Sequence, residues 1–203
     1  MWFPPYDRFP GEPDTYPNTE RSANFCKIAT DIGVSTGIAI DEQGRVYVVG
    51  ARAGVRRYSP PFPTAPDAAG GCGHTDSLGS PLADTVNVET FIPLSTDAAT
   101  PTGIARAANG NWYVSSVFTG TIAEYTPEGA FVRLVLQKPA GEATLPYSTG
   151  HPQGLAVDAD GDLYYADLAL RISPSGGIGP GPNGTVRWIA FDDAGTPQPP
   201  VTI

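Results

Sequence analysis

The residue with the clearest chemical potential in this 203-residue chain is His151. Histidine is a common metal ligand and acid–base group near neutral pH. His151 stands directly before Pro152, at the entry to a repeated motif, and we take it as the candidate catalytic residue. A catalytic histidine needs a partner, and the second histidine, His74, lies in a long segment rich in Pro and Gly. An ordinary loop histidine is therefore the alternative interpretation.

Three polar side chains recur at one place in the motif, directly before a glycine. They are Thr36, Thr102 and Gln153. Their neutral oxygens can form hydrogen bonds, whereas calcium and related divalent cations favour sites that include carboxylates. We therefore predict these three residues to bind a ligand, with no metal assigned to them. The alternative is that they cap strand ends or line a wet channel.

The motif that positions these residues occurs three times, as STGIAIDEQGRVYVVG, PTGIARAANGNWYVSS and PQGLAVDADGDLYYAD. The copies align on the anchor glycines Gly37, Gly103 and Gly154. In each copy a second glycine follows after seven residues and a tyrosine after ten. A run of apolar and small residues, a glycine turn and a run rich in Val, Tyr, Trp and Leu together predict a tight β-hairpin.

Further strand-like segments follow each hairpin. They cover residues 54–60, 88–94, 121–129, 130–136, 170–176 and 185–191. In the third copy we expect 170–176 to be the third strand and 185–191 the fourth, joined by the glycine-rich loop 176–184. No helical periodicity is sustained. Four antiparallel strands per repeat predict an all-β fold, a β-propeller with about three blades near 35–95, 101–137 and 152–192.

The hairpin motif resembles that of NHL-repeat propellers. The third copy carries the resemblance best, through Pro152, Gly154, Leu155, Ala156, Val157, Asp158, Gly161, Leu163, Tyr164, Asp167, Arg171 and Ile172. Similar blade signatures occur in the gluconolactonase/senescence-marker family and in the streptogramin lyases. The resemblance implies a rigid binding platform for a small molecule, sugar or protein at the axial loop face. The alternative that it implies is a gluconolactonase-like hydrolase or streptogramin-lyase-like enzyme that uses a divalent cation such as calcium.

In gluconolactonase-like enzymes the residue before the anchor glycine supplies Asn or Asp ligands to the cation. Thr36, Thr102 and Gln153 occupy those positions here, so the sequence departs from that pattern. This departure argues against the gluconolactonase-like hydrolase.

Other motif residues have structural roles in this interpretation. They are Gly37, Gly103, Gly154, Asp158 and Asp167. We expect Asp158, like Asp41, to bond to the backbone of its own turn. Asp167 corresponds to Gly50 and Ser116 in the other copies, and we expect its carboxylate to accept backbone N–H groups and tie strands together.

The composition limits the partners. The formal net charge of −9 repels phosphate backbones, so we expect no nucleic-acid binding. No long apolar run is present, so we expect no membrane insertion. The expected partner is a small-molecule or protein ligand at the axial face. Relatives of this type are often exported, so we expect a secreted or periplasmic protein, although this sequence shows no signal peptide.

The ends of the repeat array raise a question about assembly. We expect residues 1–23 to form an irregular Pro-rich arm, and residues 24–203 to form a partial propeller with a long insertion at 60–84. Closed propellers usually have at least four blades. We therefore expect a fragment of a larger propeller, with self-association through the exposed end blades and a self-sufficient open unit as alternatives. Cys26 and Cys72 either pair or remain unrelated thiols.

Overall fold

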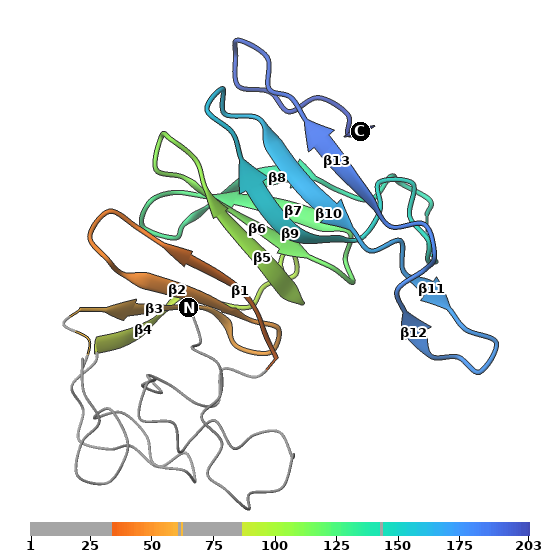
Figure 1. The fold of residues 1–203 in the computed structure, drawn as a ribbon, viewed down its shortest axis with the longest axis horizontal. Coiled ribbons are helices and arrows are strands. Elements are labelled where there is room, and N and C mark those ends of the chain that lie inside the picture. Colours follow the sequence, from red (N-terminus) through yellow and green to blue (C-terminus); the bar gives the residue numbers. More distant parts are fainter. Residues whose placement is uncertain (1–33, 61, 63–86, 143) are drawn as a thin grey trace, which may run out of the picture. The chain divides into compact units, whose positions relative to one another are not determined.

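The computed structural model of the protein describes residues 34–60, 62, 87–142 and 144–203. The regular elements among these residues are all β-strands (Figure 1). The chain divides into two compact units, one of residues 1–31 and 58–88 and the other of residues 32–57 and 89–203. The second unit contains most of the described strand residues. The predicted arm at 1–23, most of the insertion at 60–84, Cys26, Cys72 and His74 lie outside the described residues.

Three four-stranded antiparallel sheets follow one another along the chain, and each is one blade. Blade 1 has the order β1 (Ser35–Ile40), β2 (Val46–Gly50), β3 (Gly54–Ser59), β4 (Asn87–Ile92). Blade 2 has the order β5 (Pro101–Arg106), β6 (Trp112–Ser116), β7 (Thr121–Tyr125), β8 (Phe131–Leu136). Together with the third sheet, these blades confirm the all-β partial propeller.

Blade 3 departs from the prediction for its outer strands. The hairpin β9 (Pro152–Val157) and β10 (Leu163–Asp167) forms as expected. However, β10 pairs directly with β13 (Thr185–Ile189), and β13 pairs with β14 (Val201–Thr202). The segment predicted as the third strand instead contributes β11 (Arg171–Ile172), which pairs with β12 (Ile178–Gly179) in a separate hairpin (Figure 1).

The chain leaves the third sheet at a sharp local bend, which explains why this prediction was wrong. Ala169, two residues after the end of β10, has a positive φ of 46°, a conformation that is incompatible with an extended strand. The N–H of Gly181 then bonds to the carbonyls of Leu168 and Ala169. These bonds close the base of the β11–β12 hairpin and return the chain to the sheet, so residues 185–189 take the third place.

The turns of the three inner hairpins share one geometry. Gly44, Gly110 and Gly161 have φ values of 72°, 89° and 92°, in the left-handed region that glycine adopts without strain. The carboxylates of Asp41 and Asp158 each accept backbone N–H groups two and four residues later, at 3.0 and 2.9 Å in both turns. The predicted glycine turns are confirmed.

Apolar side chains fill the space between consecutive blades. The layer between blades 1 and 2 contains Tyr47, Val49, Val55, Phe91, Ile92, Ile104, Trp112, Val114, Ala123 and Tyr125. The layer between blades 2 and 3 contains Tyr113, Ile122, Val135, Leu136, Leu163, Tyr165 and Ile189. Because side chains alternate along a strand, blade 2, which lies between the other two, contributes one set of residues to each layer.

The inner strands β1, β5 and β9 approach one another at the anchor glycines. A Cβ atom on Gly103 would lie 1.9 Å from the carbonyl oxygen of Gln153. A Cβ atom on Gly37 would lie 3.0 Å from the carbonyl oxygen of Thr102. On Gly154 the nearest atom would be 4.0 Å away. Glycine therefore permits backbone contact between consecutive blades at the first two positions.

Gly103→Ala should destabilise the protein by about 1–3 kcal/mol or more, because the added methyl group meets backbone that cannot move aside. Gly179→Ala is the control, since a Cβ there meets no atom of the described residues within 4 Å. We expect the control to change the free energy of unfolding by less than about 0.5 kcal/mol. Urea denaturation measures both, and equal losses would contradict the close-approach argument.

Candidate functional site

The predicted ligand-binding residues lie at irregularities in the inner hairpins. The pairing register of β1 with β2 shifts between Ser35 and Gly37, and that of β5 with β6 shifts between Pro101 and Gly103. Thr36 and Thr102 are the residues skipped at these shifts, and Gln153 lies in the corresponding irregular stretch of β9. A bulge of this kind re-aims a side chain relative to the ladder.

The three side chains differ in how far they reach solvent. Thr36 is exposed, Gln153 is half-buried and Thr102 is buried. The Thr102 hydroxyl donates a hydrogen bond to the carbonyl of Pro152 at 3.3 Å. The structure therefore leaves Thr36 and Gln153 available at strand starts, while Thr102 already contacts the neighbouring blade.

Ser115 completes this polar seam between blades 2 and 3. Its hydroxyl is fully buried, lies 3.3 Å from the Thr102 hydroxyl and donates to the carbonyl of Gln153 at 2.6 Å. Sequence reasoning had no signal for this role, because the corresponding residues of the other repeats are Val49 and Ala166. The contact fixes the carbonyl of Gln153, one of the predicted site residues, with a side chain from blade 2.

His151 is fully buried at the entry to β9. Its Nδ1 accepts a hydrogen bond from the N–H of Leu170 at 3.0 Å, and its ring lies 4.9 Å from that of Tyr147. With Nδ1 as acceptor, the neutral ring carries its proton on Nε2, which is buried and has no hydrogen-bond partner among the described residues. The imidazole organises the loop after β10, and its catalytic role stays a prediction.

Asp167 lies beside His151 and gathers the polar groups at this end of blade 3. Its Oδ1 accepts the backbone N–H of His151 at 2.7 Å and that of Ala169 at 2.8 Å. Its Oδ2 lies 3.1 Å from Nε of Arg187 on β13. A Cβ atom on Gly150 would lie 2.1 Å from this carboxylate, so the preceding loop passes directly against it.

In blade 2 the residue at the position of Asp167 is Ser116, whose hydroxyl is a weaker hydrogen-bond acceptor than a carboxylate. Ser116, which pairs with Pro101 as Asp167 pairs with Pro152, accepts the backbone N–H of Thr100 at 3.0 Å. Blade 1 has Gly50 there, which has no side chain to offer. The loop before the inner strand is thus held by a carboxylate in blade 3 and by a hydroxyl in blade 2, and blade 1 has no side chain at this position.

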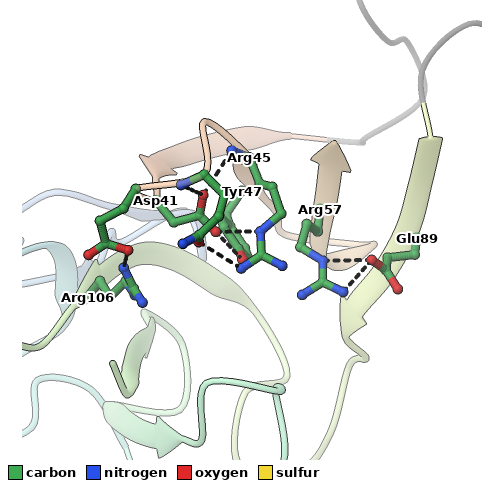
Figure 2. Close-up of polar contacts among 8 residues, drawn as sticks. Asp41, Arg45, Tyr47, Arg57, Glu89 and Arg106 are labelled. Atoms are coloured by element: carbon green, nitrogen blue, oxygen red, sulfur yellow. Dashed lines mark hydrogen bonds and ion pairs between the residues drawn. The ribbon is translucent and has the colours of Figure 1, made fainter. Parts of the chain in front are cut away.

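A second polar network joins blade 1 to blade 2 (Figure 2). The buried carboxylate of Asp41 accepts hydrogen bonds from Nε of Arg45 at 2.5 Å and from the Tyr47 hydroxyl at 3.0 Å. Burial opposes ionisation of Asp41, but the hydrogen bonds from Arg45 and Tyr47 outweigh it and hold the pKa of Asp41 below its ordinary value. The carboxylate is therefore charged and fully engaged.

Two ion pairs accompany Asp41 in this network. Glu42 pairs with Arg106 across the two blades, and Arg57 pairs with Glu89 within blade 1 at 2.5 Å (Figure 2). The Arg106 guanidinium also lies 5.4 Å from the centre of the Trp112 ring, a cation–π contact. Each charged group already has a partner, so we interpret the network as structural.

The described residues contain no group of three or more His, Cys, Asp or Glu side chains placed to hold a metal ion. Within the same part of the chain no helix is long and apolar enough to cross a membrane. The backbone N–H of His151, the candidate acid–base group, donates to the Asp167 carboxylate, as described above.

Comparison with known proteins gives similarities in structure alone. No protein-family model matches the sequence, and no curated protein matches it. The structure is similar to a gluconolactonase from Xanthomonas campestris, with 18% identity and a TM-score of 0.49 over 83% of this chain and 46% of that chain. It is also similar to a chain of a nidogen/laminin complex, with 16% identity and a TM-score of 0.47 over 84% and 48%.

A third similar structure is virginiamycin B lyase from Staphylococcus aureus, with 14% identity and a TM-score of 0.41 over 83% of this chain and 56% of that chain. This chain therefore spans about half the length of the chains that it matches. The fold assignment rests on the three blades and the way they pack, rather than on these similarities.

The burial of His151 predicts a pH-dependent stability. Burial lowers the pKa of His151 below its ordinary value of 6.5, Asp167 opposes this shift, and Arg171 and Arg187 add to it. As the pH falls below about 6.5, the unfolded chain takes up a proton that the folded chain resists. The free energy of unfolding should therefore decrease from pH 7 to pH 5, by at most about 1.4 kcal/mol per pH unit.

His151→Asn tests this expectation, because Asn keeps an acceptor for the N–H of Leu170 but does not titrate. Urea denaturation at pH 7, 6 and 5 should show a smaller pH slope for the variant than for the wild type. An unchanged slope would assign the pH dependence to other groups.

The Asp167 carboxylate should contribute more to the free energy of unfolding than a hydroxyl at the same position, such as that of Ser116 in blade 2. Asp167→Ala leaves the N–H groups of His151 and Ala169 without their acceptor and removes the ion pair with Arg187, and we expect a loss of about 2–4 kcal/mol in the free energy of unfolding. Asp167→Ser restores one acceptor, as at Ser116, and should lose less. Thermal and urea denaturation measure both; a Ser variant no better than the Ala variant would show that the backbone bonds matter little.

Proposed function

We propose that this protein is a rigid propeller platform that binds an uncharged polar ligand, with a saccharide as the leading class, where β1, β5 and β9 begin. The supporting observation is the backbone contact at Gly37 and Gly103, which holds three strand starts side by side. A ligand that bridges adjacent strand starts meets a preformed surface, so little conformational entropy is lost on binding.

The side chains available on this surface favour an uncharged ligand. Thr36 offers a hydroxyl and Gln153 an amide, and each can both donate and accept hydrogen bonds. Sugar hydroxyl groups require the same two capacities. The net charge of −9 disfavours anionic ligands such as phosphates and nucleic acids.

The test is a titration of the isotope-labelled protein, followed by amide NMR, with glucose, galactose, arabinose, cellobiose and lactose. At least one sugar should shift the amide signals of Thr36 and Gln153. Thr36→Ala and Gln153→Ala should each weaken binding up to about tenfold, because each removes one neutral hydrogen bond. Asp160→Ala, an exposed change at the opposite end of the β9–β10 hairpin, is the matched control and should not change the affinity.

Two results would contradict this proposal. One is a titration in which no sugar perturbs the strand starts. The other is hydrolysis of glucono-1,5-lactone by the wild type in the presence of calcium, which would support the metal-dependent enzyme instead.

A further inference from the structure

In each blade, a residue's position after the anchor glycine determines which face of the sheet its side chain occupies. Residues two and ten positions after the anchor glycine face the next blade, as Ala39 and Tyr47 of blade 1 do. Residues one and nine positions after the anchor face the preceding blade, as Ile104 and Trp112 of blade 2 do. The rule holds again between blades 2 and 3, where Tyr113 packs with Leu163.

No described residue covers the face of blade 1 that would receive a preceding blade. Ile38 is 60% exposed, whereas Ile104 at the same position of blade 2 is 6% exposed. Ile40, further along the same face, is 65% exposed. Adjacent apolar side chains exposed on one sheet face mark a surface that binds another protein surface.

Blade 3 has, on the face that would contact a following blade, residues at the positions that make this contact in blades 1 and 2. Tyr164 occupies the position of Tyr47 and Tyr113, which are both buried under the next blade, but Tyr164 is only half-buried. Val186 and Val201 extend this face along β13 and β14 and are 47% and 51% exposed.

Gly154 supplies the decisive observation. The anchor glycines of blades 1 and 2 each allow the inner strand of the following blade to come close, and a Cβ on Gly103 would meet the backbone of Gln153 at 1.9 Å. Gly154 is the third anchor, yet among the described residues a Cβ there would meet only Ala166, at 4.0 Å. No residue in the described part of the chain fills the space that a following inner strand would occupy.

We propose that a second copy of this chain fills that space: blade 3 of one copy packs on blade 1 of the other, with Gly154 against the inner strand β1. A ring of two copies makes this contact twice and has six blades, within the four to eight that are typical of closed propellers. The contact joins two different faces, so it is heterologous, and it ends at two copies because the ring closes.

Charge is compatible with this contact. Between blades 1 and 2, Glu42 pairs with Arg106, which lies three positions after its anchor. In the proposed contact the corresponding positions are Ala159 of blade 3 and Ile40 of blade 1. Neither is charged, so docking leaves no unpaired charge at this place.

Sedimentation equilibrium of the full chain tests the proposal. The wild type should have twice the mass of one chain. Ile38→Lys places a charge in the contact and should raise the dissociation constant by at least about 100-fold. Gly154→Ala should also dissociate the dimer, by keeping the inner strands apart. Circular dichroism should show that both variants keep the wild-type β-structure.

Ile178→Lys is the matched control, because Ile178 is 53% exposed and lies on the β11–β12 hairpin, a two-stranded sheet separate from blades 1 and 3. It should remain a dimer. Mixing the Ile38→Lys and Gly154→Ala variants should restore association, because each retains the face that the other has lost. A monomeric wild type, species larger than two copies, an Ile38→Lys variant that associates like the control, or no association in the mixture would overturn the proposal.

Discussion

The contact between backbones at the anchor glycines is the constraint on which the other layers depend. Because Gly37 and Gly103 have no side chain, the inner strands of consecutive blades touch, and this sets how closely the blades approach. That spacing brings the Thr102 and Ser115 hydroxyls within reach of carbonyls in the next blade. The aromatic and aliphatic layers then fill the rest of the space between the blades.

The polar groups at the strand starts follow from the same geometry. Once the inner strand is held at its glycine, the loop before it must turn into the blade, and its N–H groups lose water. Asp167 accepts one such group in blade 3, the N–H of His151, and Ser116 accepts one in blade 2, the N–H of Thr100. Buried donors of this kind need acceptors, so the acceptor at this position is tied to the shape of the entering loop.

The sequence allowed the inner hairpins to be predicted because both their glycine turns and their alternation are local signals. The outer strands of blade 3 could not be predicted in this way, since segments 170–176 and 185–191 both have strand composition and their pairing is decided by the bend at Ala169. The two residues of β14 carry no sequence signal. The burial of Thr102 and of His151 depends on contacts with Pro152 and Leu170, which spacing alone does not reveal.

The β11–β12 hairpin shows how such a sheet can change without being rebuilt. It leaves and rejoins blade 3 at one point, where the N–H of Gly181 meets the carbonyls of Leu168 and Ala169. The antiparallel pairing of β10 with β13 is continuous from Leu163 to Asp167 and is not interrupted by the hairpin. The segment between Ala169 and Gly181 can therefore be lengthened, shortened or replaced by a foreign peptide at little cost in the free energy of unfolding. This makes the hairpin a suitable place to graft new recognition loops.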